Sequence, residues 1–144
     1  MPKTSSDKKV VLAGGCFDVL HPGHIIFLEK AKKIGDYLVV LLESDQKVRL
    51  LKGAGRPIHS QKDRARVLKA VRFVDEVVML PYLESDKAYD EVVNRIKPDI
   101  IATTSGDKNL HHYQRSAKAA KAKLIFVTKL IGDYSTSRIL NHRK

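Results

Sequence analysis

The sequence lacks the features that would place it in a membrane or in an oxidising compartment. It has one cysteine, Cys16, so no internal disulfide can form, and cysteines alone cannot build a tetrahedral metal site. No apolar run approaches the roughly 20 residues that span a bilayer. The polar N-terminal residues 1–9, MPKTSSDKK, lack the apolar core of a secretory signal. These absences predict a cytoplasmic protein without a membrane partner.

Positive charge is what the chain has in excess. Lysine and arginine number 27 against 16 acidic residues, which gives a net charge of +11. Such a balance favours anionic partners, namely nucleic acid, membrane headgroups or phosphorylated small molecules, while a solvated lysine-rich surface is the plain alternative. The basic residues are spread along the chain, with a mild concentration at 118–123, and lack the interleaved aromatics of a nucleic-acid module. Nucleic acid is therefore not the expected partner.

Apolar runs alternate with amphipathic segments from end to end. Strands are predicted at 9–15, 36–44, 75–80, 98–104 and 123–128. Helices are predicted from Pro22 to Gly35 and at 61–73, 86–96, 110–121 and 135–141, with Ser60 as an N-cap. The basic stretch 47–57 shows no periodicity and is interpreted as a loop. This alternation predicts an α/β fold: a single Rossmann-like domain over 9–144, with a five-stranded parallel sheet, helices on both faces and a polar tail at 1–8.

In such sheets ligands bind beyond the carboxyl ends of the strands. The segments expected there are 14–24, 43–56, the turn after Leu80, 105–109 and 129–137. The adjacent His111 and His112 cannot both face one ligand from a regular helix and are interpreted as surface residues.

The first of these segments, GGCFDVLHPGH, joins a strand to a helix. Its glycine pair fits neither a P-loop nor a G-x-G-x-x-G pattern, and alone it is better explained as a structural turn. His21 and His24 lie at the expected helix start, where N–H groups and the helix dipole favour a phosphate. Imidazoles there can donate hydrogen bonds to phosphate oxygens. A third metal ligand is not evident, so phosphate binding is favoured over metal binding.

The same stretch resembles the signature of the HxGH nucleotidyltransferases, specifically the cytidylyltransferase-like group. That group includes glycerol-3-phosphate cytidylyltransferase, heptose-phosphate adenylyltransferases and archaeal-type FAD synthase. GRPIHSQKDRARVLKAVRFVDEVV (55–78) and YSTSRIL (134–140) are similar to further segments of the group. The resemblance extends over about residues 9–140.

The resemblance implies transfer of a nucleoside monophosphate from an NTP to a phosphorylated small molecule, with pyrophosphate released. It implies catalytic roles for His21, His24 and Lys52. It also implies nucleotide contacts by His21 and His24 and by Gly15, Cys16, Phe17, Asp107, Tyr134, Ser135, Thr136 and Ser137. Acceptor contacts are implied for Asp18, Lys52, Arg64 and Lys87. Mg²⁺ is expected with the NTP, with no side-chain metal ligands, and a homodimer is expected by analogy.

Several alternatives stay open. ATP with a sugar phosphate is favoured, against CTP-dependent transfer to glycerol 3-phosphate and against adenylyl transfer to FMN. A regulatory protein that binds a nucleotide without turnover is the non-enzyme alternative. A nucleophilic Cys16 thiol is the rival to a simple binding role for that residue. Arg64 and the Ser135–Ser137 hydroxyls could also be a surface side chain and a plain helix cap.

Overall fold

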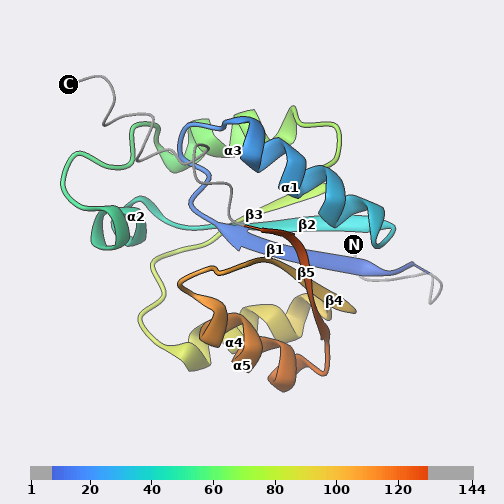
Figure 1. The fold of residues 1–144 in the computed structure, drawn as a ribbon. Coiled ribbons are helices and arrows are strands. Elements are labelled where there is room, and N and C mark those ends of the chain that lie inside the picture. Colours follow the sequence, from blue (N-terminus) through green and yellow to red (C-terminus); the bar gives the residue numbers. More distant parts are fainter. Residues whose placement is uncertain (1–7, 130–144) are drawn as a thin grey trace.

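A computed structural model describes residues 8–129, which form one parallel five-stranded sheet between two layers of helices (Figure 1). The strands are β1 (Val10–Gly15), β2 (Tyr37–Leu42), β3 (Glu76–Met79), β4 (Ile100–Ser105) and β5 (Lys123–Lys129), in the order β3-β2-β1-β4-β5. The helices are α1 (Pro22–Lys33), α2 (Asp45–Lys52), α3 (Gln61–Lys69), α4 (Asp86–Ile96) and α5 (Leu110–Ala120). The predicted fold class is confirmed.

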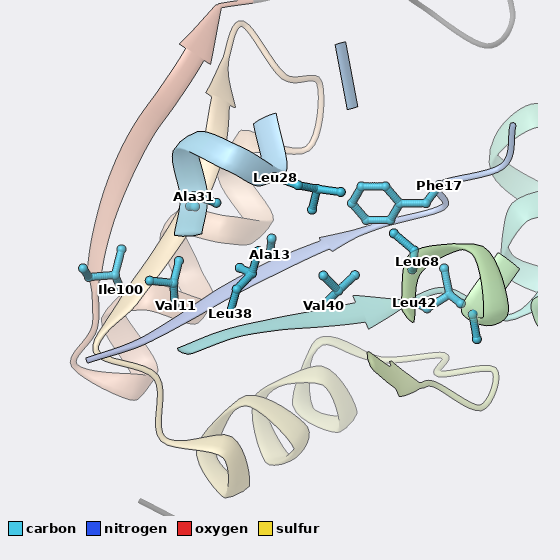
Figure 2. Close-up of a cluster of buried hydrophobic side chains, with 12 residues drawn as sticks. Val11, Ala13, Phe17, Leu28, Ala31, Leu38, Val40, Leu42, Leu68 and Ile100 are labelled. Atoms are coloured by element: carbon cyan, nitrogen blue, oxygen red, sulfur yellow. The ribbon is translucent and has the colours of Figure 1, made fainter. Parts of the chain in front are cut away.

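The sheet is apolar on both faces because helices cover both. In β1, Val11 and Ala13 face α1 and α3, whereas Val10 and Leu12 face α4 and α5. Figure 2 shows the first of these layers, where Leu28 of α1 lies close to Phe17 above the strands. The central strands β1, β2 and β4 are buried on both sides and therefore appear in the sequence as continuous apolar runs. The edge strands β3 and β5 are only partly buried, but they too are short apolar runs.

One predicted loop is wrong in part, because residues 45–52 form α2. The Ser44 hydroxyl accepts a hydrogen bond from the Lys47 amide, and Val48 is the buried residue of the helix. Gly53 ends the helix with a φ of 101°. Two of its leucines, Leu50 and Leu51, are exposed, so the helix shows little apolar periodicity in the sequence. Figure 1 shows α2 beyond the carboxyl ends of the strands.

The other boundaries differ by a few residues. The helix predicted at 61–73 ends at Lys69, and Ser60 caps it as expected through the Asp63 amide. The helix predicted at 135–141, the motif at 134–140 and residues 1–7 of the predicted tail lie outside the described residues.

The strand order puts the switch point between β1 and β4. All six residues of β1 pair with β2, but its pairing with β4 is limited to Val11–Ile100 and Leu12–Ile101. The carboxyl ends of β1 and β4 therefore part, with Gly14 and Gly15 at the edge. This is where ligands bind in open parallel sheets.

A glycine fixes how closely α1 returns to the sheet. A Cβ added at Gly35 would lie 2.4 Å from Val11 Cγ2 and 3.0 Å from the Lys9 carbonyl oxygen. Gly35→Ala is therefore expected to lower the free energy of unfolding by about 1–3 kcal/mol, since the backbone must shift to admit the methyl group. Urea unfolding measures this. Gly14→Ala is the matched control, because its added Cβ would meet Leu41 at an ordinary 3.8 Å. Equal stability of the two variants would contradict the packing argument.

Candidate active site

The two histidines cap α1 reciprocally. His21 is the N-cap residue in extended conformation, and its Nδ1 accepts a hydrogen bond from the Gly23 amide at 3.1 Å. The His24 Nδ1 accepts from the His21 amide at 3.2 Å. Pro22 occupies the first helical position, where no N–H is needed. The rings stack with their centroids 3.8 Å apart.

These contacts determine which nitrogen of each ring carries hydrogen. A ring nitrogen that accepts a hydrogen bond has no proton, so each neutral imidazole carries its proton on Nε2. Both Nε2–H groups are hydrogen-bond donors at the N-terminus of α1. The helix dipole and the backbone N–H groups there favour the same ligand, an anion.

The histidines are held in the neutral form. Burial, the neighbouring His21 and the positive charge of Lys52 lower the pKa of His24 from 6.5 to about 3. Burial lowers the pKa of His21 as well. Lys52, the last residue of α2, is exposed, and its positive charge is close enough to act on His24.

The turn between β1 and α1 has an unusual backbone. Phe17 and Val19 have φ angles of 44° and 43°, which non-glycine residues rarely adopt. The Phe17 ring packs over Gly15, where an added Cβ would lie 2.9 Å from it, and its centroid is 5.5 Å from that of His24. The turn thus supports the His24 ring from the side. Burial raises the pKa of the half-buried Cys16 thiol, so this group is protonated near neutral pH.

Asp18, expected at the acceptor, is instead fully enclosed by the segment before α3. Its carboxylate accepts from Arg56 Nε at 2.8 Å, the Ile58 amide at 2.7 Å and the His59 amide at 3.1 Å. Burial by itself raises the pKa of Asp18, but these hydrogen bonds outweigh it and the pKa falls below its usual value. Because its side chain has no exposed surface, it can influence a bound acceptor only through the loop that it holds.

Arg64 has a similar place. Only 1% exposed, it donates from Nε to the His59 carbonyl, from one terminal nitrogen to the Cys16 carbonyl and from the other to Asp45 Oδ1. It therefore ties α3 to the β1–α1 turn and to α2. A direct contact between Arg64 and an acceptor phosphate stays a prediction.

The remaining predicted residues are more scattered. Asp107 lies in the turn after β4, where its carboxylate accepts from the Asn109 amide at 2.7 Å. Lys87 is exposed on α4. His111 and His112 are both exposed as expected, although His112 reaches Asp86 at 3.6 Å. Tyr134, Ser135, Thr136 and Ser137 lie outside the described residues.

Sequence reasoning missed a pocket of about 280 Å³ on the other face of the sheet, against α4 and α5. Its walls include Leu12, Leu41, Leu80, Val93 and Ile101, and it reaches Gly14 and Gly15. Glu43, Lys47, Tyr89 and Tyr113 add polar groups. The Tyr89 hydroxyl lies 2.9 and 3.1 Å from the two Glu43 carboxylate oxygens, and burial raises the pKa of both groups. The sequence had placed Glu43 at the start of segment 43–56, which was expected at the ligand-binding edge, but gave no sign of the pocket.

A family model described as cytidylyltransferase-like matches residues 12–141. The chain belongs to this family. The match confirms the resemblance found in the sequence and supports the expectation of a nucleotidyltransferase enzyme.

Curated relatives agree with this assignment. The chain is 49% identical over 94 residues to the bifunctional protein HldE of Campylobacter concisus, and 44% identical over 94 residues to that of Desulfatibacillum aliphaticivorans. Each match covers 65% of this chain but only 19% and 18% of the relative, so the chain spans about a fifth of their length.

Solved structures agree on the fold. A lipopolysaccharide core biosynthesis protein from Thermoplasma volcanium superposes with a TM-score of 0.66 at 27% identity, over 86% of this chain and 97% of that one. Pantoate-beta-alanine ligase from Francisella tularensis gives 0.62 at 12% identity, over 89% and 62%, a likeness of fold alone.

Two further observations concern the part of the chain that the structure describes. No group of three or more His, Cys, Asp or Glu side chains between residues 8 and 129 is arranged to hold a metal ion. Within the same range, no helix has the length and apolarity needed to cross a membrane.

The neutral state of His24 predicts how stability depends on pH. The unfolded chain takes up a proton on this residue near pH 6.5, whereas the folded protein does so only near pH 3. Acid therefore favours unfolding, and the His24 contribution is lost between these values at up to about 1.4 kcal/mol per pH unit. Denaturant unfolding between pH 7 and 4.5 should show a shallower loss in His24→Gln than in the wild type. His111→Gln, at an exposed histidine, should follow the wild type. Parallel curves for the wild type and His24→Gln would contradict the depressed pKa.

The buried contacts of Arg64 predict a loss of stability when they are removed. Arg64→Met removes the buried guanidinium and with it the donors to the Cys16 and His59 carbonyls and to Asp45, and it is expected to cost about 3 kcal/mol. Arg66→Met, on the exposed side of the same helix, is the control and should change stability little. Thermal and urea unfolding measure both. If Arg64→Met matched its control in stability but raised the KM for the acceptor, the direct acceptor contact would be the correct interpretation.

Proposed function

We propose that the chain transfers a nucleoside monophosphate from an NTP to a phosphorylated small molecule and releases pyrophosphate. ATP is the proposed donor and a sugar phosphate the proposed acceptor. The observation that carries this proposal is the pair of stacked, neutral imidazoles, each with Nδ1 committed to the backbone and Nε2–H as a donor, at the N-terminus of α1.

In the proposed reaction an oxygen of the acceptor phosphate attacks the α-phosphorus. The bond from that phosphorus to the oxygen bridging the β-phosphorus breaks, and pyrophosphate leaves with the electron pair. Negative charge redistributes over the phosphate oxygens, where preorganised donors stabilise it most effectively. His21 and His24 supply two such donors, the α1 N-terminus adds backbone N–H groups, and Lys52 adds a positive charge.

The depressed pKa of His24 determines its proposed catalytic role. A neutral imidazole with a pKa of about 3 is a hydrogen-bond donor at neutral pH and not a reservoir of protons. The proposed role is therefore charge stabilisation. The raised pKa of Cys16 favours direct attack by the acceptor over a covalent cysteine intermediate, since a thiol is a weak nucleophile compared with its thiolate.

The choice of substrates rests on similarity. The sequence of segment 55–64 and the STS motif at 135–137 resemble sugar-phosphate adenylyltransferases, and the Thermoplasma volcanium protein is described as a lipopolysaccharide core biosynthesis protein. We further propose that Mg²⁺ arrives with the triphosphate, held by phosphate oxygens and water, and that the protein is a homodimer. Proposed nucleotide contacts are Gly15, Cys16, Phe17, Asp107 and residues 134–137.

Pyrophosphate release tests the proposal. ATP and CTP are each combined with glucose 1-phosphate, mannose 1-phosphate, a heptose 1-phosphate, glycerol 3-phosphate, FMN and phosphocholine. Release is expected with ATP and a sugar phosphate. His24→Ala should lower kcat by roughly 10²–10³-fold, the usual effect of removing one transition-state donor.

The control is His111→Ala, at an exposed histidine on α5, which should retain wild-type turnover. Near-normal kcat in a folded His24→Ala protein would remove the histidines from the mechanism. Tight ATP or CTP binding without release in any pair would favour a regulatory nucleotide-binding protein instead.

A further inference from the structure

The pocket against α4 and α5 contains a carboxylate for which the proposed chemistry has no use. Glu43 directly follows β2, and its carboxylate lies at the carboxyl edge of the sheet among apolar walls. None of the phosphate-binding groups needs it, since a negative charge repels phosphates. A carboxylate in a pocket that begins at Gly14 and Gly15 is suited to a ligand group that donates hydrogen bonds.

Glu43 is held in place yet retains hydrogen-bonding capacity. The Tyr89 hydroxyl approaches both carboxylate oxygens, but it has only one hydrogen to donate, while a carboxylate has about four acceptor positions. The Lys47 ammonium lies 5.3 Å from the Tyr89 ring centroid and 5.9 Å from that of Tyr82, which holds this cation beside the carboxylate. Glu43 is therefore a fixed acceptor able to receive hydrogen bonds from ligand hydroxyl groups.

Position indicates which substrate enters this pocket. The nucleotide phosphates are assigned to the α1 side of the sheet and to the opening between β1 and β4. The pocket lies on the opposite face of the sheet. From Gly15 one arm runs past Glu43 at the end of β2 to Leu80 after β3, and the other runs to Ile101 and Asn109 beside β4 and α5. An acceptor whose phosphate lies at Gly15, ready for in-line attack, would extend its carbon skeleton toward Glu43.

Charge indicates what that skeleton can carry. Three carboxylates line the pocket, those of Glu43, Glu84 and Asp86, against two permanent cations, Lys47 and Arg115. Arg115 is paired with Asp90 at 2.7 Å and Asp86 at 3.4 Å. A second anionic group on the acceptor would therefore be repelled, whereas hydroxyl groups would find acceptors.

We propose that Glu43, positioned by Tyr89, selects the acceptor by receiving hydrogen bonds from the hydroxyls of an uncharged polyol or sugar skeleton. It disfavours skeletons that carry a carboxylate. This inference rests on the proposed function for the placement of the acceptor phosphate. It assigns the pocket to a polyhydroxylated monophosphate and names the side chain that distinguishes it from an acidic analogue.

The test compares acceptors that differ in one group, a CH₂OH or a carboxylate. The pairs are glucose 1-phosphate with glucuronic acid 1-phosphate, and glycerol 3-phosphate with 3-phosphoglycerate. Binding to the full chain is measured by calorimetry in the presence of α,β-methylene ATP, and pyrophosphate release is measured in parallel with ATP. The wild type should bind at least one hydroxylated member at least tenfold more tightly than its acidic partner.

Glu43→Gln keeps the shape and removes the charge. It should weaken binding of the hydroxylated acceptor at least tenfold, and the preference over the acidic partner should fall by a similar factor. Tyr89→Phe should raise the acceptor KM with little change in kcat, because it loosens Glu43 without touching the phosphates. Glu91→Gln, at an exposed carboxylate of α4 outside the pocket, should behave as the wild type.

The two proposals fail in different ways. Glu43-dependent binding without pyrophosphate release would support the pocket assignment and reject the proposed reaction. Pyrophosphate release with selectivity unchanged in Glu43→Gln would support the reaction and overturn the role of Glu43. Failure of both hydroxylated acceptors to bind would also overturn the inference. A loss of α,β-methylene ATP binding alone in Glu43→Gln would overturn it too, because the pocket would then belong to the nucleobase.

Discussion

The reciprocal capping of α1 by His21 and His24 is the interaction on which the site depends. A helix start normally leaves backbone N–H groups that a serine or aspartate side chain satisfies. Here two imidazoles satisfy them, and the Nδ1 atom of each ring accepts a hydrogen bond from a backbone N–H group. One local backbone requirement thus sets the tautomer of both rings, their stacking and the direction in which their donors face. Burial then keeps them neutral, so they offer hydrogen bonds without the cost of desolvating a charge.

Buried ionic contacts hold this helix start against the rest of the site. Asp18 fastens the β1–α1 turn to residues 56–59, and Arg64 connects the same turn to α2 and α3. Both side chains join segments that are distant in sequence, and both are enclosed by hydrogen-bond partners. Such pairs contribute less to net stability than to a unique geometry, and phosphoryl transfer depends mainly on geometry.

Much of the fold and of the histidine site could be predicted from the sequence. The central strands were predictable because burial on both faces requires continuous apolar runs. His21 and His24 were predictable because of their spacing around Pro-Gly. The helix α2 was missed since its leucines face solvent and only Val48 is buried. The enclosed positions of Asp18 and Arg64 could not be foreseen, because a sequence reveals charged residue types but not the partners that fold against them. The pocket at Glu43 could not be predicted because its walls include residues of α4 and α5, which come together only in the folded protein.

The sheet separates the two parts of the site. The β1–α1 turn and α1, proposed to bind phosphates, lie on one side of it, and the pocket with Glu43, Tyr89 and Lys47 lies on the other, with Gly14 and Gly15 between them. Substitutions in α4 or α5 can therefore reshape the pocket without disturbing the capped histidines or the buried ion pairs. Such a layout is modular: one half can drift during evolution toward new acceptors while the other keeps its chemistry. With the proposed acceptor pocket, the α4–α5 layer is the place where an engineer would introduce new acceptor specificity.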